Sequence, residues 1–147
     1  MNSPIVNDTF RFVKWLYAEF LPVGYRDFQL DLAMDLKNDC VTKGLQSGMP
    51  DQQLEVLSLA ALLHNVGCIE GQYHSRDVSK IIARNFLEEK GYYDWDIQQV
   101  EHTIDATSEY ASFTDDCGQI IQVLKFKQMY EVANSDLHLE EMGDVFP

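Results

Sequence analysis

Apolar residues recur at helical spacing through most of the chain, and no stretch alternates between apolar and polar residues as a half-buried strand would. The first pattern predicts a helix from about residue 8 to about residue 20. Its apolar positions are Phe10, Val13, Tyr17 and Phe20. Capping side chains precede this helix at residues 7–9, and Pro22 with Gly24 is expected to end it.

Two more helices are predicted in the middle of the chain. A second apolar pattern runs from Phe28 to Leu45 and is closed by the turn-forming residues 47–50. A third pattern, from Leu54 to Leu63, is apolar almost all round, and Gly67 is expected to close its helix in the left-handed conformation. Because a helix without a polar face must be buried, this segment is expected at the centre of the fold.

The second half of the chain predicts further helices. Ser75 is expected to cap a fourth helix that Gly91 stops, and Asp94 to cap a fifth. The inward-facing residues of the fourth helix are expected to be Val78, Ile81, Ile82, Phe86 and Leu87. A last long helix is expected from Thr114 through Ala133, with an acidic start that suits the helix dipole.

The length and composition suit a single globular domain. With 147 residues, 46% of them apolar, the chain can bury a core of its own. The helical patterns therefore predict one all-α domain over residues 1–147, a compact helical bundle of five to six helices around a buried central helix.

The charge of the chain excludes some partners. It has 24 acidic residues against 11 Lys and Arg, a net charge of −13, which repels phosphate backbones and anionic lipids. We therefore expect neither nucleic acid nor a membrane surface as a partner. No apolar run approaches the ~20 residues that span a bilayer. Cys40, Cys68 and Cys117 lack CxxC spacing, which favours reduced thiols in a cytoplasmic protein.

The segments around the histidines follow the order of a known family. Five of them carry the resemblance: YRDFQL at 25–30, LAALLHNVG at 59–67, EGQYHSRDVSKIIARNFL at 70–87, IDATS at 104–108 and NSDLHLEEMG at 134–143. Their order resembles the HD superfamily of metal-dependent phosphohydrolases, named for an adjacent His-Asp pair that closes a buried helix. The resemblance covers roughly residues 22–143.

The resemblance implies a metal site whose ligand set is incomplete. In the family, a His, a His-Asp pair and a distant Asp hold a metal that polarises a phosphate ester and activates water. His64 and Asp136 match two of these ligands, whereas Leu30 stands for the first histidine and Asn65 for the aspartate of the pair. Leucine cannot coordinate and asparagine brings no charge, so the resemblance implies weak or absent binding of Fe, Mn, Ni, Co or Zn and weak or lost hydrolysis.

Other interpretations of the polar residues stay open. His74 and His102 lie where some HD branches recruit a second metal, so they could rebuild a site for an active phosphohydrolase on a nucleotide or other phosphoester. Otherwise both lie in solvent, and His64 is an ordinary buried, hydrogen-bonded histidine. Arg26, Arg76 and Lys80 can pair with the phosphate of a small phosphorylated molecule.

A non-catalytic ligand- or protein-binding module is the remaining alternative. Such a module needs no charge at the old metal position, because an isolated buried charge is costly. Aromatic residues that are candidates for a homodimer or partner interface are Tyr92, Tyr93, Trp95, Tyr110 and Phe113.

Overall fold

The computed structural model describes residues 3–71 and 75–105, and all regular secondary structure within them is helical. The elements are α1 (Pro4–Phe20), α2 (Val23–Gln46), α3 (Asp51–Leu63), the short 3-10 helix η1 (Val66–Glu70), α4 (Ser75–Glu89) and α5 (Asp94–Asp105). The predicted all-α class is confirmed. The predicted helix from Thr114 to Ala133 lies outside the described residues.

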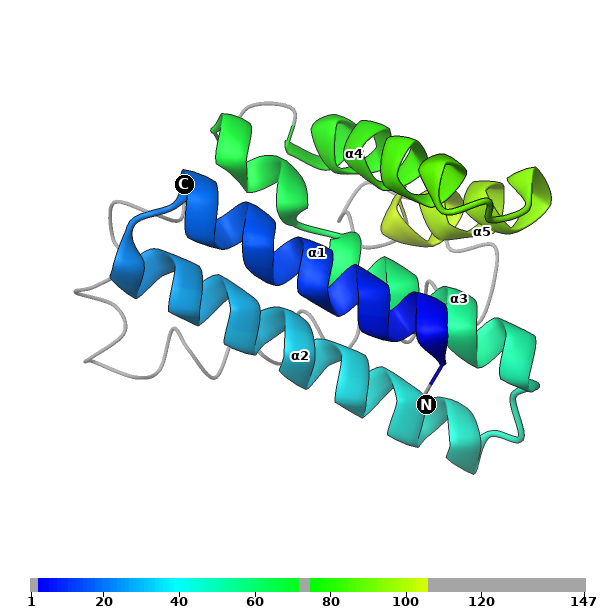
Figure 1. Ribbon diagram of the computed structural model, residues 1–147. Helices are drawn as coiled ribbons and strands as arrows, with labels where there is room; N and C mark the ends of the chain where they lie inside the picture. Colours follow the sequence, from blue (N-terminus) through cyan, green and yellow to red (C-terminus); the bar gives the residue numbers. More distant parts are fainter. Residues whose placement is uncertain (1–2, 72–74, 106–147) are drawn as a thin grey trace.

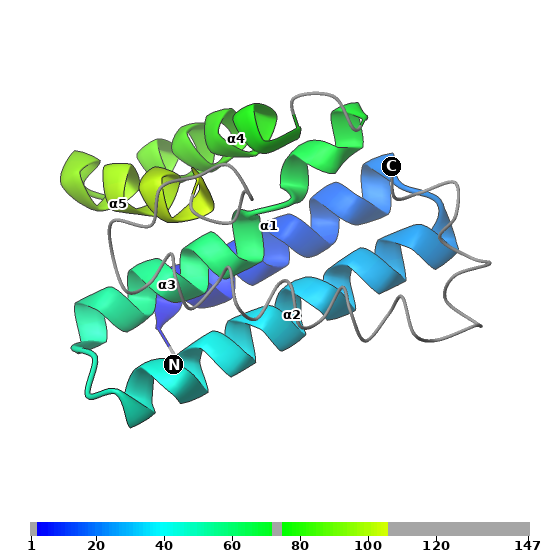
Figure 2. The same cartoon turned by 180° about the vertical axis from the view of Figure 1, so that it is seen from behind.

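Helix α3 lies at the middle of these elements. Every residue from Val56 to Leu63 is buried, and α3 packs against α1, α2, α4 and α5. Figures 1 and 2 show α1 and α2 along one side of α3 and the pair α4 and α5 along the other. This placement follows from the sequence of α3, because only neighbours on all sides remove so much apolar surface from water.

The start of α1 is set by its cap. The helix begins at Pro4, earlier than the expected residue 8, because the Oγ of Ser3 accepts a hydrogen bond from the backbone N–H of Val6 at 3.2 Å. Proline suits the first turn because its missing N–H would have no partner there.

Helices α2, α4 and α5 also begin earlier than the apolar pattern and the expected capping residues predicted. Helix α2 begins at Val23 rather than Phe28, so Gly24 lies inside its first turn instead of ending α1. Ser75 and Asp94 are the first helical residues of α4 and α5, each one position inside the helix that it was expected to cap.

Gly67 does not close α3 as the sequence suggested. The helix ends at Leu63, and Gly67 lies inside η1 with a φ outside the left-handed region. Its role is close packing, since a Cβ there would lie 1.9 Å from the carbonyl oxygen of Ser75 and 2.7 Å from the nitrogen of Ser79. The N–H of Gly67 also donates to the Ser79 hydroxyl at 2.8 Å. Only glycine lets η1 rest directly on α4.

The buried face of α4 differs from the predicted one at Ile81, which is 61% exposed. The helix buries Ser79, Ala83, Phe86 and Leu87, at helical spacing. Ile81 lies two residues from both Ser79 and Ala83, so it points away from this stripe.

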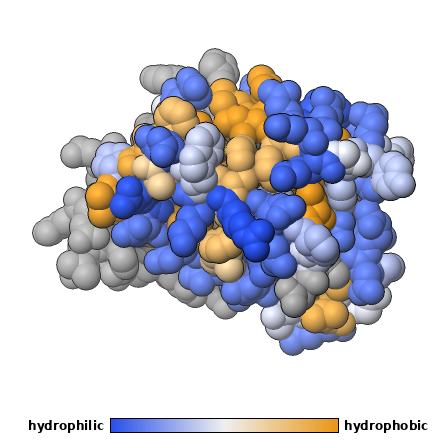
Figure 3. Space-filling model, viewed as in Figure 1, coloured by the Kyte–Doolittle hydropathy of each residue, from blue (hydrophilic) through white to orange (hydrophobic). Residues whose placement is uncertain are grey.

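The visible face of the molecule is largely hydrophilic, with apolar side chains gathered where α1 meets α4 (Figure 3). At this junction the Phe12 ring stacks on that of Phe86, with ring centroids 4.2 Å apart, and Trp15 stacks on Phe12. Within the described residues, no single helix is long and apolar enough to cross a membrane. Two consecutive segments with a sharp bend between them, Asp51–Glu70 and Ser75–Glu89, together reach the required length and apolar composition.

Candidate functional site

His64 follows the last residue of α3 and is 5% exposed. Its Nδ1 lies 2.8 Å from the backbone oxygen of Ala61. Because a carbonyl oxygen only accepts, Nδ1 carries the hydrogen of this bond, and the lone pair of the neutral ring is on Nε2. Nε2 is therefore the nitrogen that a metal or a hydrogen-bond donor would meet.

The residue after His64 pairs with helix α2. The Nδ2 of Asn65 donates to the Oε1 of Gln29 at 2.7 Å, and Gln29 is 1% exposed. Leu30, the residue that the resemblance aligned with a metal-binding histidine, packs partly buried against the hydrophobic core. The residue that α2 brings to Asn65 is thus Gln29, and the contact is between two neutral amides.

Gln29 keeps a buried donor without a full hydrogen bond. Its Nε2 meets no acceptor at hydrogen-bonding geometry in residues 3–71 and 75–105, although it lies close enough to Tyr25 to favour the ionised phenol. An unpaired buried donor costs about 1–3 kcal/mol. The cost of this unpaired donor therefore reduces the net contribution of the amide pair to stability.

A thiol lies between two phenols next to this pair. The hydroxyls of Tyr17 from α1 and Tyr25 from α2 donate to the sulfur of Cys68 in η1. Burial raises the pKa of Cys68 to about 11 despite these two hydrogen bonds, which lower it. Burial, followed by repulsion from Cys68, raises the pKa of Tyr25 to about 12 and that of Tyr17 well above its usual value. We call Tyr17, Tyr25, Gln29, Asn65 and Cys68 the neutral cluster.

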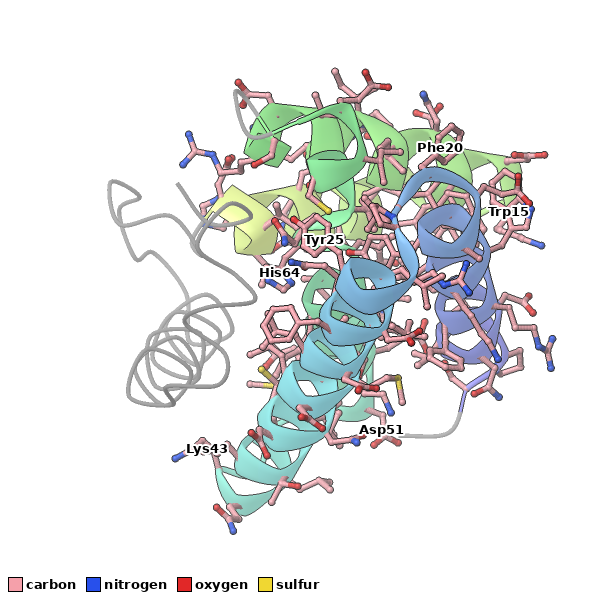
Figure 4. The ribbon with its side chains drawn as sticks, turned by 90° about the vertical axis from the view of Figure 1, so that its left-hand side faces the viewer. Trp15, Phe20, Tyr25, Lys43, Asp51 and His64 are labelled. Atoms are coloured by element: carbon pink, nitrogen blue, oxygen red, sulfur yellow. The ribbon has the colours of Figure 1, made fainter. Side chains whose placement is uncertain are left out.

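The neutral cluster joins residues of α1, α2 and η1 to Asn65, the residue that follows His64. Figure 4 shows Tyr25 and His64 toward the middle of the view, while Trp15 and Phe20 project outward from α1. The two phenols and the thiol of the cluster have ordinary pKa values above neutral pH, and burial raises each pKa further, so the cluster carries no negative charge at neutral pH. Such a cluster does not compensate the charge of a cation.

Two of the predicted phosphate-binding cations meet a single carboxylate. The Nζ of Lys80 lies 3.0 Å from one oxygen of Asp105 and 3.1 Å from the other. The Nε of Arg76 lies 3.6 Å from the same carboxylate, beyond hydrogen-bonding distance. The third cation, Arg26, is elsewhere: its Nη1 is 3.5 Å from the backbone oxygen of Ala18.

The remaining metal candidates are not joined into a site by the described residues. His102 is half-buried on α5 rather than on the exposed face considered above. No group of three His, Cys, Asp or Glu side chains in residues 3–71 and 75–105 is arranged to hold a metal ion. His74 and Asp136 lie outside the described residues.

The predicted interface aromatics have different roles. The hydroxyl of Tyr92 donates to the Oε1 of Glu55 at 2.9 Å, which ties the α4–α5 connection to α3. Tyr93 and Trp95 are 79% and 69% exposed. Tyr110 and Phe113 lie outside the described residues.

Sequence reasoning did not find Gln29, although a signal for it exists. Gln29 precedes Ala33 by four residues and Leu36 by seven, so it lies on the buried stripe of α2. The other buried residues of this helix are apolar residues, one cysteine and one glycine. A polar residue on an apolar stripe needs a partner. The spacing did not indicate that this partner is Asn65, or that Cys68 meets Tyr17 and Tyr25.

Comparison of the chain with models of known protein families, with curated proteins and with solved structures finds no match. The resemblance to the HD superfamily therefore stays a hypothesis that depends on the five sequence segments.

Proposed function

We propose that the chain is an HD-like helical protein in which metal-dependent phosphoester hydrolysis is weak or lost, and which serves as a binding module for a small phosphorylated molecule. The observation that supports the loss of hydrolysis is the amide pair next to His64. Asn65 donates to Gln29 where the resemblance requires an aspartate. An amide offers a divalent cation a neutral oxygen only, which weakens electrostatic attraction.

The charge around the amide pair supports the same proposal. Tyr25 and Cys68 are protonated at neutral pH, because the ordinary pKa values of 10.0 and 9.0 already lie above it and burial raises each pKa further. Together with the two amides they leave the neutral cluster without a charged group. A transition metal bound at His64 would have one imidazole and no anionic ligand from the neutral cluster.

Elemental analysis of the purified full chain tests the loss of the metal site. We expect Fe, Mn, Co, Ni and Zn well below one equivalent in the natural protein. Two double variants sharpen the test: Gln29→His with Asn65→Asp, and Leu30→His with Asn65→Asp. Because Gln29 is the residue that contacts Asn65, the first double variant should gain metal and the second should gain less.

The natural protein is the decisive sample in this experiment. A near-stoichiometric metal in it would contradict the proposal, as would equal metal content in the natural protein and the Gln29→His, Asn65→Asp variant. The exposed Gln46→His substitution on the same helix is a matched control for adventitious binding by an added histidine.

An active phosphohydrolase is the second candidate function. It would hold a metal with His64 and Asp136, joined by His74 or His102. The observation that favours it is the pair of cations Arg76 and Lys80, which is suited to a substrate phosphate. Hydrolysis of p-nitrophenyl phosphate or its diester that depends on one of the added metals, and is lost in His64→Ala, would support this function over the binding module.

A further inference from the structure

Two cations lie one turn apart on the same face of α4. Arg76 and Lys80 have the i, i+4 spacing at which like charges repel. Both reach toward Asp105 at the end of α5, with Lys80 3.0 Å and Arg76 3.6 Å from its carboxylate. The two cations thus share one negative charge, and the three side chains together carry a charge of about +1 on a strongly acidic protein.

The two ion pairs are unequal. Lys80 contacts both oxygens of Asp105, whereas the Nε of Arg76 has no hydrogen-bond acceptor among the described residues. A guanidinium binds best when two of its N–H groups meet two oxygens of one anion. The carboxylate of Asp105 therefore leaves the buried Nε–H of Arg76 without an acceptor among the described residues.

Asp105 is poorly placed with respect to its own helix. It is the last residue of α5, where the negative end of the helix dipole disfavours an acidic side chain. Its described ion pairs are those with Arg76 and Lys80 on α4. The two cations on α4 therefore stabilise the charge of the Asp105 carboxylate, whereas the dipole of α5 does not.

We propose that Arg76 and Lys80 form a binding site for a phosphate monoester and that the Asp105 carboxylate occupies this site as an internal competitor. The inference rests on the proposed binding function and names the residues and the anion that would carry it out. A phosphate dianion has more acceptor oxygens and more charge than a carboxylate, so it can engage the ammonium of Lys80 and the guanidinium of Arg76 together. The side chains of Arg76, Lys80 and Asp105 are 41%, 27% and 40% exposed, so an anion from solvent can reach the two cations at their exposed atoms, while the Nε of Arg76 is buried.

A charge-matched pair of variants tests the competition. Asp105→Asn removes the competitor, and Asp8→Asn removes one acidic residue beside Arg11, so both change the net charge equally. The probes are inorganic phosphate and phenyl phosphate, titrated into the full chain at low ionic strength and followed through the Nε–H signal of Arg76 in ¹H–¹⁵N NMR spectra. We expect Asp105→Asn to bind phenyl phosphate about fivefold more tightly than the natural protein, and Asp8→Asn to bind it with unchanged affinity.

Two further substitutions test the cations. Lys80→Met should weaken binding of phenyl phosphate by about tenfold, while Arg11→Met, which removes a cation from an exposed pair, should leave it unchanged. If Asp105→Asn binds the probe no better than Asp8→Asn, or if Lys80→Met binds it as well as Arg11→Met, the proposed anion site is wrong. Metal content and hydrolysis play no part in this readout. A metal-loaded natural protein would therefore contradict the proposed loss of hydrolysis without touching the anion site.

Discussion

At the scale of single residues, Gly67 is where two elements come into backbone contact. Its N–H donates to the Ser79 hydroxyl, and its Cα faces the backbone of Ser75. The hydroxyl of Ser79 also donates to the carbonyl oxygen of Ser75 at 2.8 Å. Helix η1 thus packs on the first turn of α4 through these hydrogen bonds, and the contact leaves no space for a side chain at residue 67.

Gly67→Ala should be strongly destabilising. An added Cβ would overlap the carbonyl of Ser75, and backbone on both sides must move to relieve the overlap. We expect a loss of roughly 2–3 kcal/mol in the free energy of unfolding, measured by urea denaturation followed by circular dichroism. The control is Gly24→Ala inside α2, where a Cβ meets nothing within 4 Å and alanine favours the helix. Equal effects of the two substitutions would contradict the close-packing role.

Cys68 is expected to make the protein less stable at alkaline pH. Its pKa is raised from 9.0 to about 11, mainly by burial, so the unfolded chain loses this proton at lower pH than the folded chain does. The contribution of Cys68 to stability is therefore complete below pH 9 and declines as the pH rises toward 11. The loss should be on the order of 2 kcal/mol across that window.

Urea denaturation at pH 8, 9 and 10 checks this expectation. Because serine does not titrate in this range, Cys68→Ser should lose less stability between pH 9 and 10 than the natural protein does. Parallel pH profiles for the two proteins would show that another group causes the alkaline loss.

At the scale of elements, Arg84 joins α4 to α5. Its Nε donates to Glu101 at 3.1 Å and its Nη1 to Asp94 at 2.8 Å and to Glu88 at 2.9 Å. Hydrogen bonds to Glu101, then Asp94 and Glu88, hold the pKa of Arg84 well above its usual value. One cation with three carboxylates is a network, and networks contribute more than isolated surface pairs.

Arg84→Met should lower the melting temperature, because α4 and α5 lose their shared cation while three carboxylates stay close together. We expect a cost of about 1 kcal/mol that shrinks when NaCl is added, measured by thermal unfolding at low and high salt. The matched variant is Arg11→Met, which removes a single exposed pair with Asp8 and should change stability by less than about 0.5 kcal/mol. A salt-independent effect of Arg84→Met would indicate lost packing instead.

At the scale of the whole molecule, net charge opposes folding. With 24 acidic residues and 11 basic ones, repulsion between like charges is stronger in the compact state than in the unfolded chain. Salt shortens the distance over which these charges interact from ~30 Å at 0.01 M to ~8 Å at 0.15 M.

We therefore expect the melting temperature of the natural protein to rise when NaCl is increased from about 10 mM to about 150 mM. Thermal unfolding followed by circular dichroism measures this change. A melting temperature that falls with salt would mean that attractive pairs such as those of Arg84 outweigh the repulsion.

The sequence alone predicted the helices better than it predicted the contacts between them. The helical class and the burial of α3 followed from the spacing of apolar residues, because a local period decides which face of a helix must leave water. Helix starts were predicted less well, since Ser3 and Pro22 set them through local bonds and backbone angles that the apolar pattern does not record.

The contacts of the neutral cluster and the anion site were decided only in the tertiary structure. Asn65 and Gln29 are 36 positions apart in the chain, and Lys80 and Asp105 are 25 apart. Which residues meet across such distances depends on the rotation and crossing of whole helices, and these are set by side-chain packing along their full length. The sequence by itself therefore determined that this protein is a helical bundle with a buried central helix and that an asparagine follows His64, and the packing of that bundle decided that the amide of Asn65 meets Gln29.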